Sequence, residues 1–176
     1  IIGGLPDVTD GFVTNVANIA NKMLAQNDAT NSVNRNLLLN NFTQYKAFQR
    51  VGSTNMDSYD PALSNDNYDG WDSINDNYAV VDFIWEATSN SPTDERTKAG
   101  QINAILEHLL HTITLIFDKS YVSWGYEDAS SDLVLAMNEA IAGGYYDPTG
   151  NYGSLQANDP TLYSRIIAQE FAYWMI

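Results

Sequence analysis

The longest helical period in the chain lies in Gln101-Ile102-Asn103-Ala104-Ile105-Leu106-Glu107-His108-Leu109-Leu110-His111-Thr112-Ile113-Thr114-Leu115-Ile116-Phe117-Asp118. Large apolar side chains recur there at i, i+3, i+4 and i+7 and share one arc of a helix: Ile102, Ile105, Leu106, Leu109, Leu110, Ile113, Ile116 and Phe117. The opposite arc carries Glu107, His108, His111 and Asp118, together with Ala104 and Leu115. We therefore predict a central amphipathic helix over about residues 95–117. Its polar arc is either a functional site or a solvated surface.

The length and composition of the chain predict one globular domain over residues 1–176. Of the 176 residues, 44% are hydrophobic and 12% aromatic, which is enough to build a packed core. Helical periods dominate and no period-two segment stands out. We therefore predict a mainly α fold of five to six helices packed around the central helix, with long acidic and aromatic-rich loops. Because the chain begins at Ile1 and its last residues follow a helical pattern, we expect a processed fragment of a longer chain.

Capping residues and breaks in the apolar pattern predict the other helices and the segments between them. Thr9 or Asp10 is expected to cap a first helix, and a second helix is expected from about residue 33 to residue 50. The remaining expectations are a helix over 78–88, loops over 119–130 and 145–153, a helix over 132–142 that Ser130 or Ser131 caps and Gly143-Gly144 ends, and a last helix after Asp159-Pro160.

The charge of the chain excludes several classes of partner. Eight Lys and Arg residues oppose 22 Asp and Glu residues, so the net charge is −14 at pH 7. This negative field disfavours binding to nucleic acid and to anionic lipid surfaces, and it favours the capture of cations. No apolar run reaches the ~20 residues of a membrane span. The absence of cysteine excludes disulfides, thiolate zinc sites and cysteine nucleophiles, and the acidic, Lys-poor composition favours an extracellular protein.

A segment rich in Asp and Asn follows the second predicted helix. Within it, Asn65-Asp66-Asn67-Tyr68-Asp69-Gly70-Trp71-Asp72-Ser73-Ile74-Asn75-Asp76 spaces oxygen-bearing side chains like an EF-hand calcium loop. Asn65, Asn67 and Asp69 take positions 1, 3 and 5, and Asp76 takes position 12. An EF-hand has Asp at position 1 and Glu at position 12, and Pro61 interrupts an entering helix. The pattern therefore indicates either a looser oxygen-lined calcium site or a solvated acidic loop.

The two histidines of the chain indicate a transition-metal site on the central helix. His108 and His111 are one turn apart along the helix and about 60° apart around it, so both imidazoles could bind one ion. Glu107 and His111, at i and i+4, share a face. We expect a third ligand from another helix, and Glu170 is the best placed glutamate. A zinc ion with three protein ligands keeps a position open for water, and Glu107 could then act as ligand or as general base.

The run Glu107-His108-Leu109-Leu110-His111, followed by Glu170 on a later helix, resembles zinc metallopeptidases of the gluzincin type. Those enzymes place their two histidines four residues apart with a glutamate just after the first. Here the histidines are three residues apart and the glutamate precedes them. The resemblance implies a zinc-dependent, peptidase-like hydrolase with His108, His111 and Glu170 as zinc ligands and Glu107 as the catalytic residue.

Two functions follow from these patterns, and the sequence leaves open whether the protein is an enzyme. The first is a secreted, acidic metal-binding domain with peptidase-like zinc chemistry and structural calcium. The second is a non-catalytic structural or assembly subunit of an extracellular polymer or surface layer, stabilised by calcium, that associates with itself or with other subunits. Motifs for serine hydrolysis and for phosphate or dinucleotide binding are absent, as are the Glu-x-x-His pairs of a di-metal centre.

Overall fold

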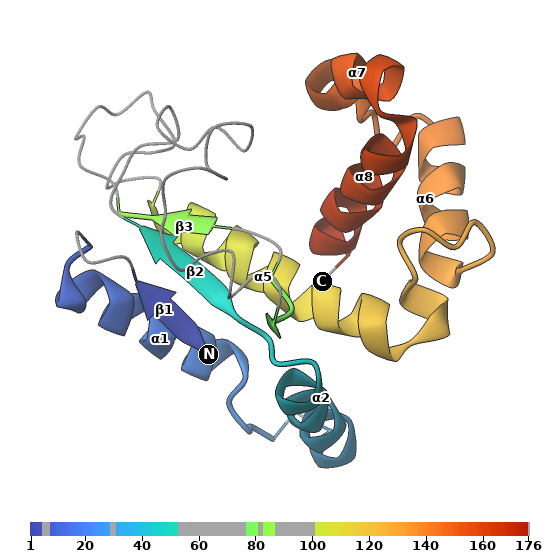
Figure 1. The fold of residues 1–176 in the computed structure, drawn as a ribbon. Helices are drawn as coiled ribbons and strands as arrows, with labels where there is room; N and C mark the ends of the chain where they lie inside the picture. Colours follow the sequence, from blue (N-terminus) through green and yellow to red (C-terminus); the bar gives the residue numbers. More distant parts are fainter. Residues whose placement is uncertain (5–7, 29–30, 53–76, 81–82, 87–100, 176) are drawn as a thin grey trace. The chain divides into compact units, whose positions relative to one another are not determined.

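A computed structural model of the chain shows two compact units, Ile1–Thr112 and Ile113–Ile176. It describes residues 1–4, 8–28, 31–52, 77–80, 83–86 and 101–175. In these ranges the fold is mainly α, as predicted, with six α-helices and one small sheet (Figure 1). None of the helices in the described ranges combines the length and the apolar character that crossing a bilayer requires. A single globular domain, cut from a longer chain, stays a prediction.

The first unit holds a small parallel sheet, which differs from the mainly helical pattern of the sequence. Its strands are β1 (Ile2–Gly4), β2 (Gln49–Gly52) and β3 (Phe83–Trp85), in the order β1-β2-β3. Ile2 lies opposite Gln49, and Val51 lies opposite Ile84, so β2 is the middle strand. The strands are only three or four residues long, whereas an alternating pattern becomes recognisable over four to eight residues. The sequence therefore shows no period of two at these positions.

The prediction of a helix over residues 78–88 is wrong at residues 83–85, which form the strand β3. Phe83, Ile84 and Trp85 are all buried. The two aromatic side chains pack in a cluster with Phe48, while Ile84 belongs to the apolar core that also contains Val51. Aromatic and β-branched side chains favour strands, and here they fill both faces of the sheet.

The helices α1 (Asp10–Met23) and α2 (Ser32–Gln44) follow β1 and precede β2. Thr9 caps α1, as predicted, because its hydroxyl accepts from the Phe12 N–H at 3.2 Å. The carboxylate of Glu86 accepts in turn from the N–H and the hydroxyl of Thr9, at 2.9 and 2.7 Å. The prediction that the second helix continues to about residue 50 is wrong. Lys46 has a left-handed φ of 52°, which turns the chain out of the helix before β2 begins.

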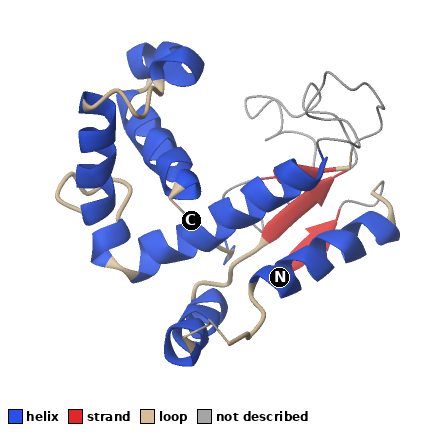
Figure 2. Ribbon diagram, turned by 180° about the vertical axis from the view of Figure 1, so that it is seen from behind, coloured by secondary structure: helices blue, strands red, loops and turns tan. Residues whose placement is uncertain are grey.

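The core of the first unit forms where α1 and α5 (Gln101–Ser120) pack with the sheet (Figure 2). Its buried members are Val8, Phe12, Val16, Val51, Ile84, Ile105 and Leu109. β1 approaches the start of α1 very closely. A Cβ atom on Gly4 would lie 2.7 Å from methyl carbons of both Val8 and Val13, so only glycine fits at this position.

The helix α5 confirms the predicted central helix from Gln101 onward and continues three residues beyond its predicted end. Residues 95–100 lie outside the described ranges. The boundary between the two compact units falls inside this continuous helix, after Thr112. Its first part therefore belongs to the first unit and its last part to the second.

The second unit is helical in all its named elements. After the end of α5 these are the 3-10 helix η2 (Val122–Trp124), α6 (Asp132–Ala142), α7 (Thr149–Asn158) and α8 (Pro160–Trp174). Ser131 caps α6, and Gly144 follows its end with a left-handed φ of 73°, as predicted. Pro160 lies in the first turn of α8, as predicted, and Asp159 caps this helix.

The prediction of a loop over residues 145–153 is wrong from Thr149 onward, where α7 begins. Gly150 and Gly153 are weak helix formers, which explains the prediction. Tyr152 and Leu155 pack against the core of the second unit, so tertiary contacts outweigh the local preference. At the start of the helix, the Asp147 carboxylate accepts from the Thr149 N–H at 3.0 Å.

Candidate metal centre

The polar arc of α5 is covered in part: Glu107, His108 and Asp118 are half-buried, and His111 is buried. His111 is 2% exposed, and Thr114, one turn further along, is 0% exposed. On the same side, Leu115 is 2% exposed and Ala104 packs against the aromatic cluster of β3. By contrast, Ile102 of the predicted core arc is 48% exposed. The imidazole of His111 therefore lies inside the protein, where polar groups are retained only with polar or metal partners.

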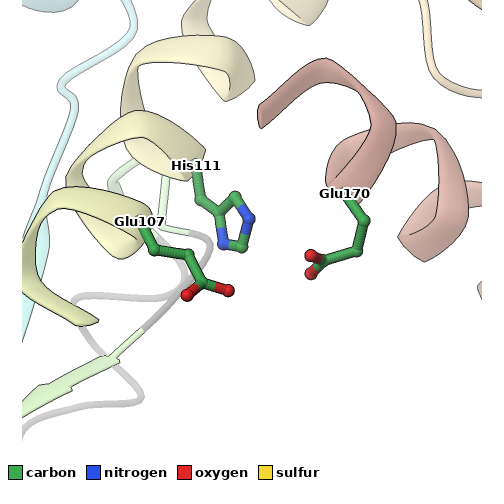
Figure 3. Close-up of side chains that lie close together, drawn as sticks. All are labelled: Glu107, His111 and Glu170. Atoms are coloured by element: carbon green, nitrogen blue, oxygen red, sulfur yellow. The ribbon is translucent and has the colours of Figure 1, made fainter. Parts of the chain in front are cut away.

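Three of the predicted site residues come together. Glu107 and His111 lie one turn apart on α5, and Glu170 lies near the C-terminal end of α8 (Figure 3). Each residue offers one ligand atom, and these three atoms all lie within 4.8 Å of one another. His111 is buried, whereas Glu107 and Glu170 are partly exposed. The group thus combines an imidazole held by packing with two carboxylates that retain some contact with solvent.

His108, the other histidine of the predicted site, is not part of this group. Its ring lies edge-on to the indole of Trp85, with centroids 5.1 Å apart, and its centroid is 5.8 Å from that of His111. The two histidines are about 60° apart around the helix. This rotation is enough to direct His108 to β3 while His111 reaches the carboxylates. Of the residues of α5, Glu107 and His111 therefore belong to the group.

The Glu-His-Glu group has the donor atoms of a site for a divalent metal ion. Carboxylate oxygens and imidazole nitrogens bind zinc at about 2.0–2.2 Å, which places two ligands of a tetrahedral ion roughly 3.4 Å apart. Ligand atoms within 4.8 Å of one another need to move by about 1 Å, which side-chain rotation of a glutamate supplies. Two carboxylates held close together repel each other. A cation between them removes that repulsion.

Two tyrosines lie near Glu170 within the second unit. Burial raises the pKa of Tyr126 and that of Tyr146 well above the ordinary value, and the charge of Glu170 adds to both shifts. The Thr114 hydroxyl lies beside the Tyr126 phenol and opposes part of its shift. The backbone N–H of Tyr126 donates to Asp118 Oδ1 at 2.8 Å. Both phenols therefore stay protonated at pH values at which a solvent-exposed tyrosine ionises.

The predicted calcium ligands Asn65, Asn67, Asp69 and Asp76 all lie outside the described residues. Calcium binding by this segment stays a prediction.

Comparison with known proteins yields no relative that would name a function. No protein family, no characterised protein and no solved structure matches this chain.

Proposed function

We propose that the protein binds a divalent metal ion, with zinc as the expected ion, through Glu107, His111 and Glu170. The supporting observation is that one imidazole and two carboxylates offer ligand atoms within 4.8 Å of one another. His111 is 2% exposed, so packing holds its ring in place before an ion binds. The net charge of −14 also raises the concentration of cations around the chain.

The number of ligands favours a catalytic zinc site over a structural one. Structural zinc sites have four protein ligands, usually with thiolates among them, and this chain has no cysteine. With three protein ligands, a zinc ion keeps a position open for water and lowers the pKa of that water to about 7. We therefore extend the proposal to hydrolysis of amide or ester bonds, the chemistry of the gluzincin-type peptidases that the sequence resembles.

Within this proposal all three side chains are ligands of the ion. His111 and Glu170 bind the ion. Glu107 completes the set of three ligands, since its carboxylate lies within 4.8 Å of the other two ligand atoms. Both carboxylates are partly exposed.

Metal titration of the dialysed full chain tests the proposal. We expect one equivalent of Zn²⁺ or Co²⁺ to bind to the wild type. His111→Ala and Glu170→Gln should each weaken binding by more than the roughly 10–100-fold that outer-shell substitutions cost. His108→Phe keeps an aromatic ring against Trp85 and is the matched histidine control. Glu139→Gln, at an exposed position of α6, is the matched glutamate control.

Both controls should bind the ion like the wild type. Wild-type affinity in His111→Ala would refute the site, and loss of affinity in His108→Phe would return His108 to the ligand set. Hydrolysis is then measured with a pool of quenched fluorescent peptides. The zinc-loaded wild type should cleave some of them and Glu107→Gln should not, whereas a loaded but inactive wild type would limit the function to metal binding.

A further inference from the structure

A buried hydrogen bond joins the middle strand of the sheet to α5, one residue after His111. The Thr112 hydroxyl donates to the side-chain oxygen of Gln49 at 2.6 Å. Gln49 is 1% exposed and Thr112 is 5% exposed, so both groups are inside the first unit. The side-chain nitrogen of Gln49 donates to the backbone carbonyl of Arg50 at 3.1 Å. This second bond orients the amide and leaves its oxygen for Thr112.

Apolar packing alone could hold α5 against the sheet at this point. Ile105, Leu109 and Thr112 follow one another at i, i+4 and i+7, so they form one line along the helix. Gln49 and Val51 point to the same face of β2 because side chains alternate along a strand. Val51, Ile105 and Leu109 belong to one apolar cluster. An apolar pair at positions 49 and 112 would extend this cluster without burying polar groups.

A hydrogen bond specifies the rotation of a helix about its axis more closely than apolar contacts do. Apolar attraction is non-directional, whereas a hydrogen bond weakens steeply with distance and angle. One residue corresponds to 100° of rotation in an α-helix. When Thr112 faces β2, His111 therefore points about 100° away, to the side that also carries Glu107.

We infer that Gln49 and Thr112 are positioning residues for the proposed metal centre, and this role rests on the proposed function. Their bond sets the rotation of α5 at which Glu107 and His111 present their ligand atoms to the ion. All four residues belong to the first unit, and three of them lie within six consecutive positions of one helix. Neither Gln49 nor Thr112 touches the ion in this scheme, so they act only through α5.

Three variants of the full chain test this role. Thr112→Val removes the hydroxyl with little change in volume, and Thr112→Ser keeps a hydroxyl at the same place. The double variant Gln49→Met/Thr112→Val replaces the polar pair by an apolar one. For each protein, Co²⁺ affinity and the visible absorption spectrum of bound Co²⁺ are measured, together with the urea midpoint of the metal-free form.

We expect Thr112→Val to weaken Co²⁺ binding by about 10-fold or more and to change the Co²⁺ spectrum, since supporting residues of metal sites typically contribute this much. Thr112→Ser should retain the affinity and spectrum of the wild type. The double variant should regain the urea midpoint of the wild type but not its affinity. If Thr112→Val alone does not fold, the double variant and the wild type make the comparison.

The outcomes separate this inference from the proposal that it rests on. Wild-type affinity and spectrum in Thr112→Val would overturn the positioning role and leave the metal centre standing. Recovery of affinity together with stability in the double variant would also overturn it, because the bond would then serve folding alone. If the wild type itself binds no Co²⁺, the metal centre fails and the positioning role fails with it.

Discussion

Ser131 shows how much of this fold depends on single polar side chains. Its hydroxyl oxygen accepts from the Val134 N–H at 3.2 Å at the start of α6, and the hydroxyl donates to the Gly125 carbonyl at 2.7 Å. Ser131 is 2% exposed, so water does not replace either bond when the hydroxyl is removed. The neighbouring Ser130 is the other cap that the sequence allows, and the structure selects Ser131.

Ser131→Ala is therefore expected to lower the free energy of unfolding by about 1–2 kcal/mol. Urea denaturation followed by circular dichroism measures this loss. Ser130→Ala is the control, because the Ser130 hydroxyl donates to the exposed Asp128 at 2.6 Å and does not cap α6. Equal losses in the two variants would contradict the assignment of the cap to Ser131.

The helix α5 has apolar side chains around most of its circumference, and this makes its buried side hard to predict. The period of the sequence groups Ile102 and Ile116 on one arc and Leu115 on the other. In the structure Ile116 is 0% and Leu115 is 2% exposed, whereas Ile102 is 48% exposed. A helical period shows which residues share a face. The strands and helices that pack against the helix settle which face is covered.

Ile116→Ala should consequently lower the free energy of unfolding by about 2–4 kcal/mol, since it leaves a cavity in the core. Ile102→Ala, the same substitution at an exposed position of the same helix, should cost less than about 1 kcal/mol. Denaturation of both variants under the same conditions gives the comparison. A larger loss for Ile102→Ala would contradict the burial of Ile116 and the exposure of Ile102 in the structure.

The net charge of −14 acts on the protein as a whole and opposes the folded state through repulsion between carboxylates. The Debye length falls from about 10 Å at 0.1 M salt to about 3 Å at 1 M. We therefore expect the Tm to rise with NaCl concentration over this range. Calorimetry in the presence of a chelator measures the effect without a contribution from bound metal. A Tm that falls with salt would show that attraction between opposite charges dominates.

The candidate site could be predicted in part. Glu107, His111 and Glu170 stand out in the sequence because carboxylates and imidazoles on helices are the natural ligands of a metal ion, and the structure brings these three together. The spacing of the histidines also suggests His108 as a ligand, but its ring lies against Trp85. No pattern in the sequence indicates the bond between Gln49 and Thr112.

Local sequence accounts for the mainly α fold, for the caps at Thr9, Ser131 and Asp159, and for the negative charge of the chain. These features follow from composition or from contacts within a few residues. The parallel sheet, the covered side of α5 and the surroundings of His111 emerge only from long-range packing. The physical reason is sequence separation: Thr112 bonds to Gln49, 63 residues away, and β3 is a strand only because β2 pairs with it. The helix period locates His111 within α5, and distant segments of the chain supply its environment.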